Sequence, residues 1–236
     1  MHIPDGFLSN AINLTTAGIT VAMMALALKK ARREMTEKEV PLVGVTAAFI
    51  FAAQMINFPV AGGTSGHFLG AALASILLGP WLSFIIMALV LVLQCLGFAD
   101  GGLTALGSNI VNMGLFGGIG GYLFFRVFQA LLPSNTRGFL LASAISSWFS
   151  VVLASLACAL ELGLSGTSPF ALVIPSMLGV HVLIGIGEAL ITTAILSAVL
   201  RARSDLIRSW KGQNPDFKQT RSGPQAACQQ TGKGKI

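Results

Sequence analysis

The sequence is poor in charge. Only 10% of its 236 residues are Asp, Glu, Lys or Arg, whereas 54% are hydrophobic and the mean hydropathy is +0.77. A soluble domain carries about 25% charged residues. The composition therefore excludes an ordinary soluble protein and predicts a protein of the lipid bilayer. The net charge of +6 does not indicate a nucleic-acid partner, because the basic residues cluster between apolar runs.

Two chemical signatures are also missing. The three cysteines, Cys95, Cys158 and Cys228, form no CxxC pair, so neither a disulfide framework nor a zinc site is predicted. The stretch 232–234 reads GKG, but it lacks the upstream glycine and the following Ser or Thr of a phosphate loop. We therefore expect that the chain is not an enzyme and carries no ATPase motif of its own.

Long apolar runs are what the sequence has in abundance. Six of them are long enough for membrane helices; they lie at residues 10–29, 41–57, 80–97, 103–131, 137–162 and 176–201. A further run at 67–78 would span only about 18 Å as a helix, less than the ~30 Å of a hydrocarbon core. The sequence therefore predicts an all-α bundle of seven helices, one of them short and half-buried.

The basic residues fix a predicted topology. All 15 Lys and Arg lie within residues 29–38, 126–137 and 201–235. By the positive-inside rule these parts face the cytoplasm, and the connections without Lys or Arg face outward. We expect the N-terminus outside and the C-terminus inside, with a membrane domain at 1–203. The polar residues 204–236 are predicted to form a disordered cytoplasmic tail.

The N-terminus itself is the first candidate metal site. The α-amine of Met1, the amide nitrogen of His2 and the His2 imidazole can close fused chelate rings, and the imidazole of His67 can complete a plane. Four coplanar nitrogens suit Ni(II), Cu(II) or a related ion. Such a site needs an intact N-terminus. We expect no signal-peptide cleavage, because the segment shows no cleavage site, and we expect Met1 to remain because histidine is a bulky second residue.

His67 follows a glycine-rich outward connection. We expect Thr64 or Ser65 to cap a helix whose first turn contains His67, with the helix dipole keeping the imidazole neutral. A histidine at such a place can equally be a hydrogen-bonded cap, so the residues alone leave a metal site and a structural histidine open. Ser65 and Asp5 are candidates for contacts that orient the ligands.

Two ionisable residues lie within the last apolar run. Glu188 follows His181 by seven positions and falls on the same helix face. They can support the metal ligands from a second layer, or form a buried structural pair, and both interpretations remain open.

Small residues recur at helical spacing in two places. One stripe contains Gly44, Ala48 and Ala52, and the other lies at 114–121. Such stripes allow helices to approach closely, within the bundle or against a partner.

Three segments together carry a family resemblance. Residues 1–8 (MHIPDGFL), 62–67 (GGTSGH) and 179–188 (GVHVLIGIGE) resemble the CbiM/NikM family, the substrate-binding components of energy-coupling-factor transporters for cobalt and nickel. The resemblance extends over about 1–203. It implies a six-helix core with an extra N-terminal helix, in a bacterial or archaeal cytoplasmic membrane. It also implies that Met1, His2 and His67 hold the transported Ni(II) or Co(II) in a square plane.

The resemblance further implies partners. These are a transmembrane coupling component, a pair of ATP-binding-cassette ATPases and a small accessory membrane protein, with the stripe of Gly44, Ala48 and Ala52 as candidate docking surface. Cobalt instead of nickel as the main substrate stays open. A membrane metalloenzyme with an N-terminal metal centre is the alternative of another class, although a planar set of four nitrogens leaves little room for a substrate.

Overall fold

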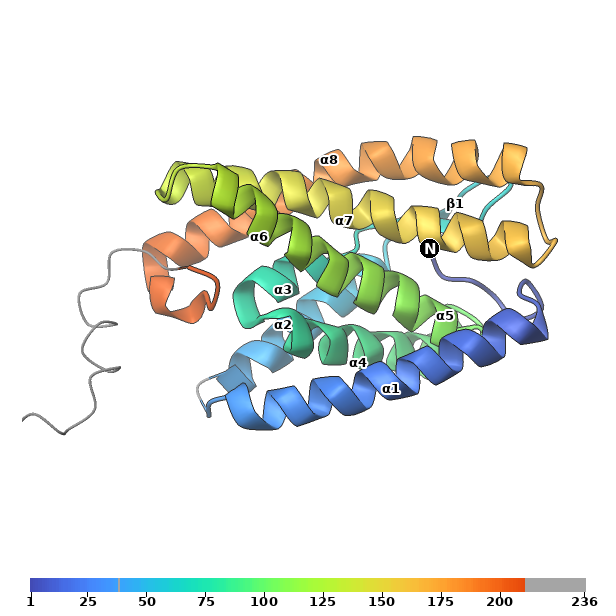
Figure 1. Ribbon diagram of the computed structural model, residues 1–236, viewed down its shortest axis with the longest axis horizontal. Coiled ribbons are helices and arrows are strands. Elements are labelled where there is room, and N and C mark those ends of the chain that lie inside the picture. The colour runs from blue at the N-terminus through green and yellow to red at the C-terminus, as the bar shows by residue number, and fades with distance from the viewer. Residues whose placement is uncertain (38, 211–236) are drawn as a thin grey trace, which may run out of the picture.

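The computed structural model describes residues 1–37 and 39–210 (Figure 1). These described residues form seven helices, one hairpin and a short 3-10 turn. In chain order the elements are α1 (Asn10–Glu34), α2 (Glu39–Gln54), β1 (Asn57–Pro59), β2 (Ser65–His67), α3 (Ala71–Leu78), α4 (Pro80–Phe98), α5 (Leu106–Ile110), η1 (Val111–Gly120), α6 (Gly121–Leu131), α7 (Thr136–Leu164), α8 (Phe170–Arg203) and η2 (Ser204–Leu206). The seven-helix prediction is confirmed, with α5, η1 and α6 forming one continuous helix.

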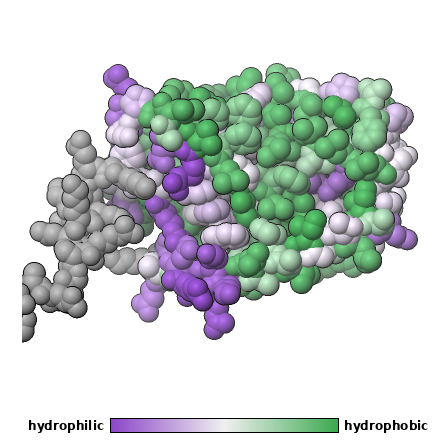
Figure 2. All heavy atoms as spheres, viewed as in Figure 1, coloured by the Kyte–Doolittle hydropathy of each residue, from purple (hydrophilic) through white to green (hydrophobic). Residues whose placement is uncertain are grey.

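Five of the described helices are long and apolar enough to cross a membrane: α1, α4, the continuous helix Leu106–Leu131, α7 and α8. The apolar helix α2 is shorter, with 16 residues. Figure 2 shows apolar side chains covering the middle of the molecule, while hydrophilic residues gather at its two ends. This distribution is typical of a protein embedded in a bilayer.

The continuous helix is wound as a π-helix in its middle, over Val111–Gly120. Its glycines permit close packing on both sides. A Cβ added at Gly117 would lie 2.8 Å from Leu69 Cδ2, and one added at Gly121 would lie 2.8 Å from Ser150 Cβ. The stripe at 114–121 therefore serves packing inside the bundle.

The connection before α3 folds into a hairpin. Strands β1 and β2 pair antiparallel, with Asn57 opposite His67, and α3 begins only at Ala71, after Gly70 with φ of +76°. The prediction that His67 lies in the first turn of a helix is wrong, and so is the predicted cap by Thr64 or Ser65. The left-handed Gly70 makes this possible, because it immediately precedes α3 and so places the start of the helix four residues after His67.

Several helices extend beyond the apolar runs that predicted them. α8 begins at Phe170 and includes Pro175, so the connection after α7 is 165–169 and not 163–175. α1 continues to Glu34, through basic residues of its last turn. Hydropathy marks the part of a helix that lies in lipid, and backbone hydrogen bonding carries the helix further into the polar region.

The chain after α8 turns back onto the bundle. Ile207 is buried, the amide of Arg208 donates to the Leu77 carbonyl over 2.8 Å, and the Trp210 ring packs edge-on against Phe139. The packed unit thus includes 204–210, which composition assigned to the polar tail. The rest of that tail, 211–236, lies outside the described residues.

Candidate metal centre

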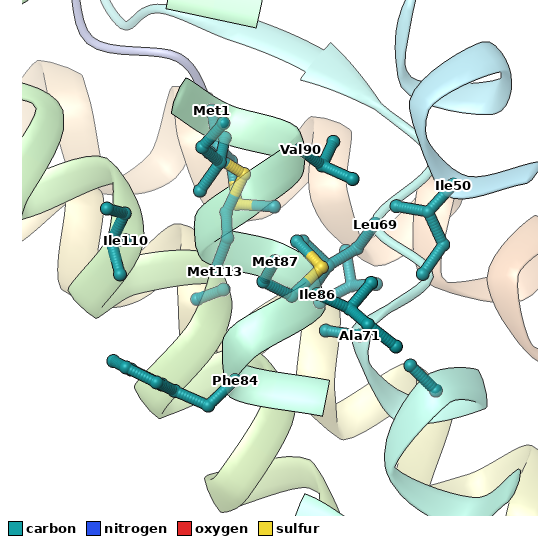
Figure 3. Packing of buried hydrophobic residues seen from close by; sticks show 14 of the residues in the cluster. Met1, Ile50, Leu69, Ala71, Phe84, Ile86, Met87, Val90, Ile110 and Met113 are labelled. Atoms are coloured by element: carbon teal, nitrogen blue, oxygen red, sulfur yellow. The ribbon is translucent and has the colours of Figure 1, made fainter. Parts of the chain in front are cut away.

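The N-terminal segment runs from α1 into the middle of the bundle, where Figure 1 marks the N-terminus. Met1 and Ile3 are fully buried, and His2 is 3% exposed. Figure 3 shows the Met1 side chain among apolar residues of the core, which include Met87 of α4 and Met113 of η1. The first residues of the chain are therefore part of the protein interior.

Two amide side chains and a loop hold this segment in place. Asn109 of α5 accepts from the Ile3 amide over 2.9 Å and donates to the Ile3 carbonyl over 3.2 Å. The same carbonyl accepts from the Gly102 amide at 2.8 Å. Further out, the Asp5 carboxylate accepts from the amide of Thr104 at 2.7 Å. Asp5 therefore fixes the segment to the α4–α5 connection and does not contact the two histidines that could bind a metal.

Ser65 accepts hydrogen bonds from both N-terminal backbone nitrogens. The Met1 amine donates to the Ser65 carbonyl and, over 2.8 Å, to its hydroxyl oxygen. The His2 amide donates to the same hydroxyl over 3.1 Å. Amine and amide, the two backbone members of the candidate chelate, thus face one residue of β2.

The rings of His2 and His67 lie together, with 4.5 Å between their centroids and 31° between their planes. The His67 ring donates from Nδ1 to the Phe68 carbonyl at 2.8 Å, and the His2 ring donates from Nε2 to Gln94 Oε1 at 3.0 Å. These partners assign the tautomers. The remaining nitrogens, His67 Nε2 and His2 Nδ1, are buried and have no hydrogen-bond partner within the described part of the chain.

The candidate nitrogens are electrically neutral near pH 7. Burial lowers the pKa of the Met1 amine from 8.0 to about 5. Burial is also the main cause for the rings: it lowers the pKa of His2 to about 3 and that of His67 well below its ordinary value, and the nearby amine adds to both shifts. Because the deprotonated forms bind metals, the site presents lone pairs to a cation.

His181 stands behind Ser65. It lies on α8, donates from Nδ1 to the Met177 carbonyl at 2.7 Å and is fully buried. Its ring is close to the backbone of Ser65 and to the Met1 amine. The structure brings all three histidines of the sequence to one place.

Glu188 holds the chain that follows His67. Its carboxylate accepts from the amides of Leu69 and Gly70, over 2.8 and 2.7 Å, and Gln54 of α2 donates to the Leu69 carbonyl at 2.7 Å. These hydrogen bonds join Glu188 to the backbone of Leu69 and Gly70 and not to His181. Glu188 holds the backbone beside His67, a position from which it can support that ligand from a second layer, and a second-layer role for Glu188 stays a prediction.

Sequence reasoning missed Gln94, Asn109 and Asp100. The first two hold His2 and Ile3, and Asp100 Oδ1 lies 3.5 Å from His2 Nδ1. The sequence did contain a signal for two of them, because Gln94 and Asn109 are polar residues that interrupt apolar runs. Polar residues inside membrane segments are costly, so they are candidates for a functional role.

The candidate docking stripe lies on the outside of α2. Gly44, Ala48 and Ala52 are all exposed, and a Cβ added at Gly44 would meet nothing within 4 Å. The stripe therefore does not serve packing within the described bundle.

The candidate metal centre is a set of nitrogens. The described residues contain no group of three or more His, Cys, Asp and Glu side chains able to hold a metal ion. The site instead combines two imidazoles with two backbone nitrogens, all of them neutral and buried. A ligand set of this kind suits a transition metal and not Ca²⁺ or Mg²⁺, which prefer oxygen.

The fold matches two solved structures of membrane proteins for transition metals. One, described as a transition metal transporter, matches 94% of this chain and 100% of its own with a TM-score of 0.81 and 32% identity. A second, described as a truncated transition metal transporter, covers 86% of this chain and 99% of its own with a TM-score of 0.80 and 34% identity.

Sequence relatives give the family. The family model described as "Cobalt uptake substrate-specific transmembrane region" (CbiM) matches residues 2–206, and the chain belongs to this family. A putative fused nickel transport protein NikMN of Archaeoglobus fulgidus is 40% identical over 88% of this chain and 68% of its own. The cobalt transport protein CbiM of Sorangium cellulosum is 32% identical over 88% of this chain and 94% of its own. The chain is thus a multi-pass component for nickel or cobalt transport in a prokaryotic cell membrane.

Proposed function

We propose that the chain is the substrate-binding component of an ATP-driven energy-coupling-factor importer that captures Ni(II) from outside. The metal ligands are the Met1 amine, the amide nitrogen and Nδ1 of His2, and Nε2 of His67. One observation carries the proposal: His2 and His67 each have one buried nitrogen without a hydrogen-bond partner in the described chain, and their rings are 4.5 Å apart.

The chemistry of this set fits a divalent cargo. Amine, amide and imidazole of the first two residues close two fused rings around a cation, and His67 contributes the fourth nitrogen. Loss of the amide proton offsets one of the two metal charges, which lowers the cost of burying the ion. Ser65 holds amine and amide on one side, and Glu188 with Gln54 holds the backbone next to His67.

The transport step requires partners. We assign a coupling component in the membrane, a pair of ATP-binding-cassette ATPases and a small accessory membrane protein, with the exposed stripe on α2 as docking surface for the coupling component. The N-terminal end of the bundle then faces outward, and the end with Arg201 and Arg203 faces the cytoplasm. The charge distribution supports this orientation, because all Lys and Arg lie at the connections of that second end or in the tail.

The decisive experiment changes the chelate without removing a side chain. An alanine inserted between Met1 and His2 adds a second amide nitrogen between the amine and the His2 imidazole, so the proposed set of amine, single amide, imidazole and His67 cannot form unchanged. A matched control inserts alanine between Gly6 and Phe7, which are exposed and leave the Met1-His2 pair intact. We expect the purified control protein to contain nickel at wild-type stoichiometry and with the wild-type absorption spectrum. The first variant should lose the metal or bind it with a changed spectrum, because the inserted amide nitrogen can take the place of a ligand. An unchanged nickel content and absorption spectrum in the first variant would refute the chelate.

Cobalt is the second candidate cargo. The name of the matching family refers to cobalt uptake, and relatives at similar identity are named for either metal. We favour nickel because planar four-nitrogen coordination suits Ni(II). Titration of the metal-free wild type with each metal, followed by competition, decides between them: nickel should displace cobalt at equal concentration.

A further inference from the structure

The outer end of the bundle contains acidic residues but no basic ones. The connections at 1–9, 55–64, 99–105 and 165–169 include Asp5 and Asp100 and no Lys or Arg. Asp5 is exposed, and its carboxylate is bonded to Thr104. Asp100 is different, because it lies between the surface and the candidate metal centre.

The two oxygens of the Asp100 carboxylate face different surroundings, one toward the exposed surface and one toward the buried His2 ring. Oδ2 accepts from the Asn57 side chain over 2.9 Å, and Asn57 is exposed. Oδ1 lies 3.5 Å from His2 Nδ1. The side chain of Asp100 is 18% exposed and that of His2 is 2% exposed. One carboxylate thus connects the aqueous mouth with the buried ring.

The contact between Asp100 and His2 is not an ordinary hydrogen bond. Nδ1 has no hydrogen-bond partner in the described residues, and Gln94 already accepts from the other ring nitrogen. In this tautomer Nδ1 carries a lone pair, so an anionic oxygen and a nitrogen lone pair face each other across 3.5 Å. A divalent cation is attracted by both groups, since carboxylate and imidazole are both ligands of first-row transition metals.

We propose, building on the proposed function, that Asp100 is a capture ligand: it binds the incoming divalent cation at the mouth and passes it to His2 Nδ1. The carboxylate then leaves the metal, whose final ligands are the four nitrogens. Asp100 therefore accelerates association and contributes little to the affinity of the completed complex. Charges that steer an ion toward a site act on the association rate in this way.

The test separates the effect of the position of the Asp100 carboxylate from the effect of its charge. In Asp100→Asn the side chain keeps its size but loses its charge. A second variant combines Asp100→Asn with Asn57→Asp, which retains the net charge of the mouth and an amide–carboxylate pair but moves the carboxylate away from His2. Association and dissociation rates of Ni(II) are measured by stopped-flow with the metal-free full chain, at about 0.01 M and 1 M salt, where the Debye length falls from about 30 to about 3 Å.

We expect both variants to associate with Ni(II) about tenfold more slowly than the wild type at low salt. Their dissociation should slow by a similar factor, because the metal leaves through the same Asp100-bound intermediate, so that the affinity for Ni(II) changes little. If the double variant regains the wild-type association rate, general surface charge suffices and the capture role is refuted. A faster dissociation with unchanged association would show instead that Asp100 only orients His2. A wild-type protein that binds no Ni(II) overturns the proposed function together with this inference.

Discussion

The two ends of the bundle are held together by different interactions. At the end that contains the N-terminus, Ile3 and His2 are bound by the side-chain amides of Asn109 and Gln94, over 2.9 to 3.2 Å. At the opposite end, Arg208 forms an ion pair with Glu34 at 2.8 Å and lies 3.9 Å from Glu39. Amide and carboxylate side chains support the candidate metal centre, whereas the ion pairs of Arg208 hold the other end together.

This difference follows from what each end must do. A site for a divalent cation cannot contain a permanent positive charge, because like charges in a buried place repel strongly. Its supports must therefore be dipoles, as Gln94 and Asn109 are, or carboxylates, as Asp5 and Glu188 carry. The end with Arg208 is partly exposed, so full charges there keep much of their hydration. Variants at the two ends should consequently separate metal binding from stability.

The largest effect is expected for His67→Ala. This variant removes the one side chain that supplies a ligand from outside the N-terminal segment. We expect the affinity for Ni(II) to fall at least about 100-fold, since even the loss of a group behind the ligands costs about 10- to 100-fold. Isothermal titration of the metal-free protein measures it.

His67→Gln serves as the matched variant, because it retains a polar side chain of similar size in the same buried position. It too should lose the metal, while thermal unfolding shows whether the fold persists. Nickel affinity at the wild-type level in either variant would remove His67 from the ligand set.

Glu188→Leu should have the next largest effect. The leucine leaves the amides of Leu69 and Gly70 without their acceptor inside the bundle, at a cost of about 1–3 kcal/mol for each buried donor. The backbone beside His67 then loses its fixed position, and we expect nickel affinity to fall about tenfold. Glu188→Gln retains one acceptor oxygen and should give an intermediate loss. Equal affinity in all three proteins would confine Glu188 to a purely structural role.

Much of the fold could be predicted because membrane helices are encoded by run length. The apolar runs predicted the seven helices, and the three histidines of an apolar sequence singled out His2, His67 and His181. Their convergence was not encoded in this way. It depends on the hairpin and on the left-handed Gly70, which place His67 before α3 instead of inside it.

The supports of the candidate centre were harder to predict for a physical reason. Gln94, Asn109 and Asp100 act through directed hydrogen bonds or close contacts to residues about 100 positions away along the chain. Hydropathy registers such residues only as interruptions of an apolar run. Periodicity gives the face of a helix on which a side chain lies but not the partner on another element.

The smallest effect is expected for Arg208→Ala, and it concerns stability alone. Its side chain is about one-third exposed, so each ion pair contributes about 0–1 kcal/mol, and the bond to the Leu78 carbonyl, at 3.2 Å, about 1 kcal/mol. We expect the Tm of the purified protein to fall by about 2–4 °C for each kcal/mol lost. Arg208→Lys, which keeps the charge, should recover part of the loss, and 1 M salt should narrow the difference by screening. Nickel affinity should stay at the wild-type value. A fall in that affinity would mean that the charged end transmits its state to the metal centre, and the two ends would then have to be treated as one coupled unit.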